Sequence, residues 1–271
     1  MSIHLEQEVA DFSERRLRLA TAITDYADWL DRQHGIDAER TLRLADTASG
    51  LRQDKLVVAF VAEFSRGKTE LINALFFADH GQRLLPSDAG RTTMCPTELF
   101  ANPDDVPSLC LLPIETRRRE ESLARLKHMP IEWCRILLDP TDPRQLQESL
   151  KKLTETKAIP AVEAIDLGLW SGEDASERHQ LRPDGTVEVP VWRYAMVNYP
   201  HPLLQAGLTI LDTPGLNALG AEPELTLSVI PNAHAVMYLL ATDTGVTRTD
   251  LEIWQKHVHR HANYHVAVLN K

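Results

Sequence analysis

Residues 55–77 read KLVVAFVAEFSRGKTELINALFF, and this stretch decides the fold. The apolar, β-branched run at 56–61 is too short for a typical helix and predicts a buried strand. Residues 69–77 repeat apolar side chains three and four positions apart, which predicts a helix. Between them, residues 62–69 (AEFSRGKT) follow the phosphate-loop pattern, with Ala62 where the first glycine is expected.

The residue types of this loop suit a polyphosphate ligand. Backbone N–H groups of such a loop and the N-terminus of its helix converge on one point. Lys68 would reach the β- and γ-phosphate oxygens, the Thr69 hydroxyl would hold Mg²⁺, and Gly67 would let the backbone approach the phosphates. A chance Gly-Lys-Thr at a helix start is the weaker alternative, given the strand and helix around it. The loop residues expected to contact nucleotide are Glu63, Phe64, Ser65, Arg66, Gly67, Lys68 and Thr69.

The composition bounds the class of protein. The chain has 271 residues, 43% of them hydrophobic and 25% charged, which is typical of one large globular domain with or without an appendage. A net charge of −10 argues against nucleic acid or an anionic membrane as the partner of the whole surface, although a local basic patch is compatible with it. Three cysteines without CxxC spacing indicate neither a disulfide framework nor a zinc site.

The N-terminus resembles no secretory signal. Residues 1–12, MSIHLEQEVADF, lack a basic segment followed by an apolar core. No apolar run in the sequence is long enough to span a bilayer. The simplest interpretation is a soluble cytoplasmic protein.

The first 53 residues predict helices. Residues 4–33 form one long helix in this interpretation, Gly35 ends it, and Asp37 caps a second helix that runs to about Leu51. These helices either pack on the globular domain or belong to a bundle that needs further helices. The first helix has apolar residues alternately four and three positions apart, interrupted at Arg16: Leu5, Val9, Phe12, Leu19, Ile23, Tyr26 and Leu30.

Residues 54–271 predict an α/β domain of three layers with a mostly parallel sheet. A mostly helical insertion is expected at about 115–186, where proline residues punctuate short helical patterns. A further helix is predicted at 249–260. Strands after the phosphate loop are predicted at 97–101, 108–114, 187–197, 208–211, 234–240 and 265–269.

Two loops of this domain have the form of nucleotide switches. Thr92 and Thr93 lie between the first helix and the next strand, where phosphate-loop GTPases use a threonine to bind Mg²⁺ only while the γ-phosphate is present. Asp212 ends a buried strand and would hold Mg²⁺ through water. The Gly215 N–H would contact the γ-phosphate and move on its loss.

Together these residues resemble the dynamin superfamily, in its bacterial dynamin-like branch. The loop EFSRGKTELINALF is similar to the family's phosphate loop, with Ser65 at the position of its serine. Residues 91–97, RTTMCPT, resemble its first switch and place Thr93 at the Mg²⁺-binding threonine. Residues 212–215, DTPG, resemble its second switch. The resemblance covers about 56–271 and leaves the insertion unmatched.

The resemblance implies GTP and GDP as ligands, with Mg²⁺ held by Thr69, Thr93 and Asp212. Asn270 and Lys271 resemble the first half of the guanine-specificity motif, whose aspartate would follow two residues later. We therefore expect the last elements of the fold to lie after residue 271, and guanine discrimination by this stretch alone to be weak. Asn270 would also brace the phosphate loop.

Catalysis must differ from that of small GTPases, because Leu216 stands where they place a water-orienting glutamine. The resemblance implies that a loop serine, backbone groups and a monovalent cation, K⁺ or Na⁺, take over when two GTPase domains dimerise. Ser65 is the expected water-positioning residue, and Arg66 and Arg91 are candidates to neutralise charge at the β–γ bridge. The expected catalytic set is Ser65, Thr93, Lys68 and Arg66.

The resulting hypothesis is a Mg²⁺-dependent GTPase whose turnover is coupled to self-association and membrane remodelling, peripheral at the inner face of the membrane and without nucleic-acid partners. Helices after residue 271 would complete the helical bundle. Two alternatives stay open. The chain could be another phosphate-loop NTPase, such as an assembly GTPase or an ATPase, which nucleotide competition distinguishes. It could also be a nucleotide-binding scaffold without turnover, which phosphate release distinguishes.

Overall fold

The computed structural model describes residues 2–33, 38–52, 55–63, 66–81, 83–86, 95–119, 121–171, 181–214, 230, 233–259 and 264–270. The chain forms two compact units, Met1–Lys55 with Glu121–Pro130, and Leu56–Glu120 with Ile131–Lys271. Within these described ranges, no helix combines the length and the apolar character that a membrane span requires.

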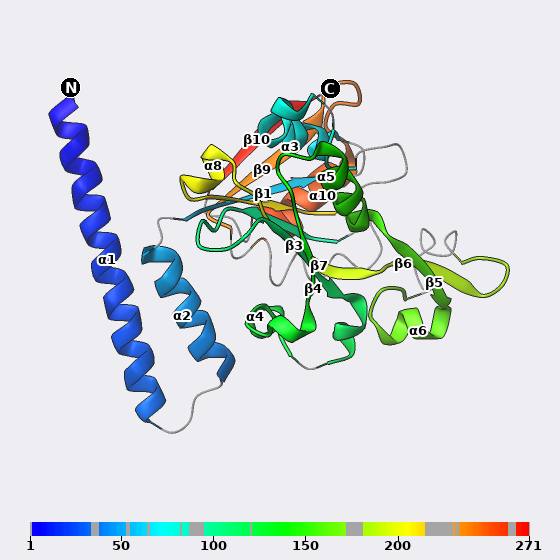
Figure 1. Ribbon diagram of the computed structural model, residues 1–271, viewed down its shortest axis with the longest axis horizontal. Coiled ribbons are helices and arrows are strands. Elements are labelled where there is room, and N and C mark those ends of the chain that lie inside the picture. Colours follow the sequence, from blue (N-terminus) through cyan, green and yellow to red (C-terminus); the bar gives the residue numbers. More distant parts are fainter. Residues whose placement is uncertain are drawn as a thin grey trace. The chain divides into compact units, whose positions relative to one another are not determined.

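The first unit is helical. Helix α1 (Ser2–Arg32) and helix α2 (Ala38–Arg52) confirm the two helices that the sequence predicts, and they form an antiparallel hairpin (Figure 1). The unit also contains the short helix α4 (Leu123–Lys127), whose N-cap Ser122 accepts a hydrogen bond from the Arg125 amide. The small side chains of Ala20, Ala27 and Ala48 are buried in this unit, which is typical of helices whose backbones lie close together.

The predicted apolar stripe of α1 is offset from the face that α2 covers. Ala20 and Ala27 of α1 and Ala48 of α2 are buried, whereas Leu19 and Tyr26 are 53% and 51% exposed. The stripe positions at 5, 9 and 12 lie outside the residues whose side chains the structure describes. The need of this stripe for further helices stays a prediction.

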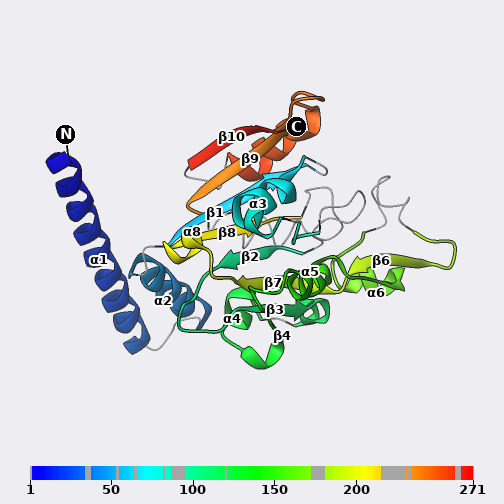
Figure 2. The ribbon, with the colours of Figure 1, turned by 45° about the horizontal axis from the view of Figure 1, so that its top comes forward.

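The second unit is built on an eight-stranded sheet with the order β10-β9-β1-β8-β2-β7-β3-β4, which runs from top to bottom in Figure 2. Four of its seven pairings are parallel, so the predicted mostly parallel α/β sheet is confirmed. Its strands are β1 (Leu56–Ala62), β2 (Thr97–Phe100), β3 (Ser108–Pro113), β4 (Cys134–Leu137), β7 (Trp192–Asn198), β8 (Leu208–Asp212), β9 (Ala235–Ala241) and β10 (Tyr264–Asn270).

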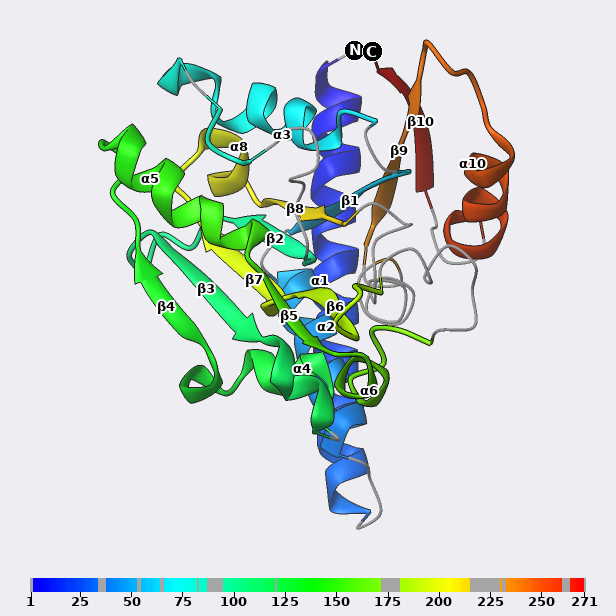
Figure 3. The ribbon, with the colours of Figure 1, turned by 90° about the vertical axis from the view of Figure 1, so that its right-hand side faces the viewer.

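Helices cover both faces of the central strands. Figure 3 shows α3 (Lys68–Phe76), α5 (Pro143–Leu150) and α8 (Pro202–Gln205) on one side of the sheet, and α10 (Arg248–Ile253) on the other. The side chains of β9 alternate between the two faces of the sheet, as in any strand. Leu239 belongs to the core under α3, and the ring of Tyr238 contacts Trp254, which follows α10. The core under α3, α5 and α8 includes Phe60, Ile72, Phe76, Leu146, Leu150 and Leu204.

The predicted helical insertion is only partly helical. Its helices are α4, α5 and α6 (Ala161–Asp166), but β4 extends the main sheet as its edge strand. In addition, β5 (Thr156–Pro160) pairs with β6 (Thr186–Pro190) in a separate two-stranded sheet. Periodicity cannot assign such short segments, since their conformation depends on the strand that pairs with them.

The single strand expected at 187–197 is two strands in different sheets. Pro190 ends β6, and Trp192 begins β7 in the main sheet between β2 and β3. The helix expected at 249–260 is α10 followed by a π-helical turn, η7 (Trp254–Val258). The described part of the chain also contains the short helical turns η1 (Ala78–His80), η2 (Ile114–Arg118), η3 (Pro130–Glu132) and η4 (Lys151–Thr154).

Candidate nucleotide-binding site

Four parallel strands end at one edge of the sheet. Their last residues are Ala62 of β1, Asp212 of β8, Ala241 of β9 and Asn270 of β10. In open α/β sheets, ligands bind outside the carboxyl ends of the strands. The fold therefore brings Asp212, Asn270 and the phosphate-loop residue Lys68 to one edge, as the sequence predicts.

The phosphate loop enters α3 through a glycine. Gly67 is the N-cap and has a φ of 74°, a left-handed conformation that glycine adopts without steric cost. The side chains of Lys68 and Thr69, the first two residues of α3, are buried. Position 62, where the pattern has its first glycine, does not need a left-handed conformation. Ala62 is extended within β1 and pairs with Leu239 of β9.

Lys68 binds the strand end that carries the second-switch motif. Its Nζ donates to the Asp212 carboxylate and to the Thr213 carbonyl oxygen, and both side chains of the ion pair are more than nine-tenths buried. The Thr213 hydroxyl donates to the Phe60 carbonyl at 2.7 Å and so fixes this strand end against β1. Lys68 thus forms an ion pair with Asp212, the residue expected to bind the metal ion. A bound phosphate would have to replace Asp212 as the partner of Lys68.

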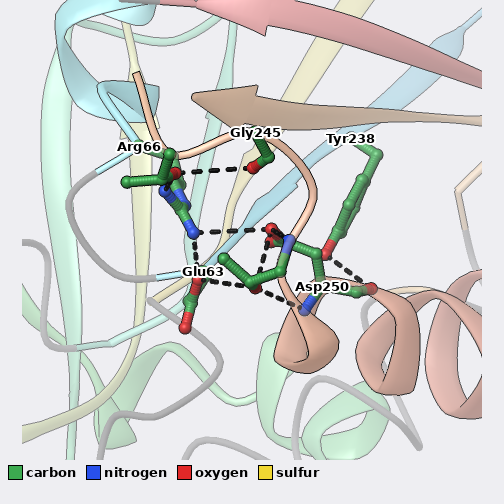
Figure 4. Close-up of polar contacts among 7 residues, drawn as sticks. Glu63, Arg66, Tyr238, Gly245 and Asp250 are labelled. Carbon is green, nitrogen blue, oxygen red and sulfur yellow. Dashed lines mark hydrogen bonds and ion pairs between the residues drawn. The ribbon is translucent and has the colours of Figure 1, made fainter. Parts of the chain in front are cut away.

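Arg66 turns toward the other side of β1. Its guanidinium donates to the Glu63 carboxylate and lies 3.4 Å from Asp250 Oδ2 (Figure 4). It also donates to the Thr244 hydroxyl. The side chain is 7% exposed. The catalytic role expected for Arg66 stays a prediction, and this geometry commits its charge to two carboxylates.

Asp250 is fixed by its own contacts. It forms a capping box with Thr247: its Oδ2 accepts from the Thr247 amide at 2.9 Å, and its amide donates to the Thr247 hydroxyl at 3.1 Å. The Tyr238 hydroxyl donates to Asp250 Oδ1 at 3.2 Å. Burial, and then the charge of Asp250, raises the pKa of Tyr238, so the phenol stays protonated as a donor.

Sequence reasoning missed Asp250, Tyr238 and Thr244. The one available signal was the Thr-x-x-Asp spacing at 247–250, which is typical of a helix start. That spacing places the carboxylate in the first turn of a helix but does not show which cation pairs with it.

Asn270 contacts the phosphate loop from β10. Its Nδ2 donates to the Arg66 carbonyl oxygen at 2.9 Å, which is the bracing contact expected from the sequence. Its contact with a guanine base stays a prediction. The other expected residues, Phe64, Ser65, Arg91, Thr92, Thr93, Gly215, Leu216 and Lys271, lie outside the described residues, and their roles stay predictions.

A strand, a glycine-capped helix with buried lysine and threonine, and an aspartate at the end of the neighbouring strand define a phosphate-loop nucleotide-binding domain. The sequence model of the dynamin family matches residues 58–271, which is most of the chain. The chain belongs to the dynamin family and carries its GTPase-type domain.

Individual relatives agree with this family. The chain is 29% identical over 213 residues to a bacterial dynamin-like protein of Nostoc punctiforme, covering 78% of this chain and 24% of that protein. It is 45% identical over 60 residues to the isoniazid-induced protein IniA of Mycobacterium tuberculosis, covering 21% of this chain and 9% of IniA. The chain thus spans about a quarter of the length of the Nostoc relative.

Two solved chains come from an oligomerised bacterial dynamin pair that provides a mechanism for the long-range sensing and tethering of membranes. They overlap 93% and 99% of this chain with 17% and 15% identity. Each has a TM-score of 0.46, and the overlap covers 35% of each solved chain.

Proposed function

We propose that this chain binds GTP with Mg²⁺ and hydrolyses it as the GTPase domain of a dynamin-like protein. The observation that carries the proposal is the position of Lys68 and Thr69 at the start of α3, opposite Asp212 at the end of β8. The lysine supplies a buried cation for the β- and γ-phosphates. Membership of the dynamin family supports guanine as the base.

The side chains at this edge fit a magnesium ion. Asp212 offers a carboxylate and Thr69 a hydroxyl, which are the hard oxygen donors that Mg²⁺ prefers. The resemblance adds Thr93 as a third donor. Such an ion would supply positive charge to the phosphates. Asp212, which contacts Lys68 in this structure, would then bind the ion in place of Lys68.

Water activation is assigned by resemblance. Ser65 would orient the attacking water, Thr93 would bind Mg²⁺ while the γ-phosphate is present, and Lys68 would stabilise charge on the phosphates. A monovalent cation, K⁺ or Na⁺, belongs to the same proposal. Leu216 has an apolar side chain and cannot hydrogen-bond to water, which is why these groups are needed.

The proposed biological setting follows the family. Turnover would be coupled to self-association of GTPase domains and to membrane remodelling, in the cytoplasm and peripherally at the inner membrane face. Helices from outside residues 1–271 would cover the half-exposed Leu19 and Tyr26 of α1.

The test is phosphate release by the intact chain with GTP, with and without Mg²⁺, and with ATP as a competitor. The proposal expects Mg²⁺-dependent release that the Lys68→Ala variant lacks. Release that ATP supports equally well, with no guanine preference even in a longer chain, would favour the other NTPase classes. Bound GTP without release above the Lys68→Ala background would make the protein a nucleotide-binding scaffold.

A further inference from the structure

We propose that Arg66 is a positioning residue: its buried guanidinium holds the phosphate loop against the start of α10 and so sets the affinity for GDP and GTP alike, without acting on the reacting phosphate. The inference rests on the proposed function, because it assigns how that same site is kept in shape. It replaces the catalytic role that the sequence suggested for Arg66.

The first step is the direction of the guanidinium. One terminal nitrogen donates to Thr244, and the other donates to Glu63 and lies 3.4 Å from Asp250. The planar fork of arginine fixes its donors in one plane, so a side chain held at both ends cannot also turn to a phosphate. Of the three guanidinium nitrogens of Arg66, Nε is the one without a hydrogen-bond partner among the described residues.

The second step is the side of the loop on which this happens. In the sheet order, β8 and β9 flank β1 on opposite sides. Lys68 takes its partners from the end of β8, whereas Arg66 takes Thr244 and Asp250 from the segment after β9. The two cations therefore serve different neighbours of the same loop.

The third step is charge. Glu63 and Asp250 place two carboxylates beside the phosphate loop, with side chains 18% and 1% exposed. Arg66 is the cation that both contact. Removing one partner of a buried ion pair leaves an uncompensated charge, which is costly. Here the remaining charge would be negative, and it would destabilise the loop position in which Glu63 and Asp250 lie close together.

The fourth step is that the backbone of Arg66 is held as well. Asn270 donates to its carbonyl oxygen, and Gly67 follows at once with its left-handed φ. Arg66 lies between the end of β1 and the start of α3. From there it contacts the end of β10 and the segment after β9. Because loop N–H groups cradle the phosphates that GDP and GTP share, an error in loop position should weaken both nucleotides equally.

The experiment measures equilibrium dissociation constants of the intact chain for labelled GDP and for a non-hydrolysable GTP analogue, and the single-turnover rate at saturating GTP. The variants are Arg66→Ala, Arg66→Lys, Asp250→Asn and the double variant Arg66→Ala with Asp250→Asn. The matched control is Arg248→Ala, which removes an arginine of α10, the helix of Asp250, whose side chain is 92% exposed. Melting temperatures are recorded for all of them.

Arg66→Ala should weaken GDP and the GTP analogue by the same factor, about tenfold, while the single-turnover rate at saturation changes by less than about twofold. Asp250→Asn should restore part of that loss in the double variant, because it removes the unpaired carboxylate. Arg66→Lys should lie between wild type and Arg66→Ala, since it keeps the charge and loses the fork. If Arg66→Ala does not fold, Arg66→Lys and Asp250→Asn carry the test and should weaken both nucleotides equally.

Two results would overturn the inference. One is a single-turnover rate that falls more than about tenfold with unchanged GDP affinity, which would make Arg66 act on the transition state. The other is wild-type affinity for both nucleotides in every Arg66 and Asp250 variant. These results leave the proposed function intact. A wild-type chain that binds no guanine nucleotide would instead overturn the proposed function and this inference together.

Discussion

The two cations of the phosphate loop, Lys68 and Arg66, lie two positions apart and are both buried, but they face opposite sides of β1. The partners of Lys68 are Asp212 and a backbone carbonyl. Phosphate oxygens can replace them as partners of Lys68, and a metal ion can replace Lys68 as the partner of Asp212. The partners of Arg66 are the Thr244 hydroxyl and the carboxylates of Glu63 and Asp250, and Asp250 is held in a helix cap. The comparison separates an exchangeable ion pair, which binds ligand, from a permanent one, which shapes the loop.

The largest expected effect is on the exchangeable side. Lys68→Ala removes the mobile cation at the β- and γ-phosphates and should weaken GTP binding by at least about a thousandfold. Titration with labelled GTP measures it, and Lys151→Ala, which removes an exposed lysine, is the control. Binding by Lys68→Ala within about twofold of wild type would remove the phosphate-loop assignment.

On the permanent side, the expected effect is on stability. Arg66→Ala leaves Glu63 and Asp250 without their shared cation and should lower the free energy of unfolding by about 3 kcal/mol. Chemical denaturation without nucleotide measures it. Arg248→Ala should change the stability by less than about 0.5 kcal/mol. Equal stability of these two variants would contradict a structural role for the Arg66 ion pairs.

Asp212→Asn tests whether Asp212 of the exchangeable Lys68–Asp212 ion pair binds the metal ion. Asparagine keeps the shape and loses the charge, so the gain in GTP affinity from Mg²⁺ should fall by about tenfold, while affinity without Mg²⁺ should not fall. GTP titrations at zero and saturating Mg²⁺ measure the difference. The exposed Asp104→Asn serves as the control. An unchanged response to Mg²⁺ would exclude Asp212 from the metal site.

Asn270→Ala should have the smallest of these effects. It removes one hydrogen bond to the Arg66 carbonyl, worth about 1 kcal/mol, and should weaken GDP and ATP alike through the loop. Competition titrations measure both nucleotides. Loss of GDP affinity alone, with ATP unchanged, would show that Asn270 acts on the base and does not brace the loop.

The same comparison shows what the sequence can predict. The Lys68 side was found because its signals are local: an apolar strand, a Gly-Lys-Thr and a helix occupy consecutive residues, and Asp212 follows its own strand directly. The Arg66 side was missed because Arg66 and Asp250 are 184 positions apart, and nothing in either segment indicates the other. A buried ion pair across the fold leaves no periodic pattern in the sequence.

The fold follows the same rule. The buried strands β1, β8 and β9 were predicted because their residues are mostly apolar. The four-residue strand β4 and the five-residue strand β5 were predicted as helical, because their conformation comes from pairing with β3 and β6. Ala62 stands where the sequence pattern has its first glycine, but in the structure this residue belongs to the extended strand β1 and needs no glycine.

The most direct test of the division between the two cations is a structure of the intact chain with GDP and Mg²⁺ bound. The account predicts that Lys68 Nζ leaves Asp212 for a phosphate oxygen, that Asp212 faces the metal ion, and that Arg66 keeps its contacts with Glu63 and Asp250. A structure in which Arg66 has left both carboxylates to touch a phosphate, or in which Lys68 stays on Asp212 beside a bound nucleotide, would contradict it.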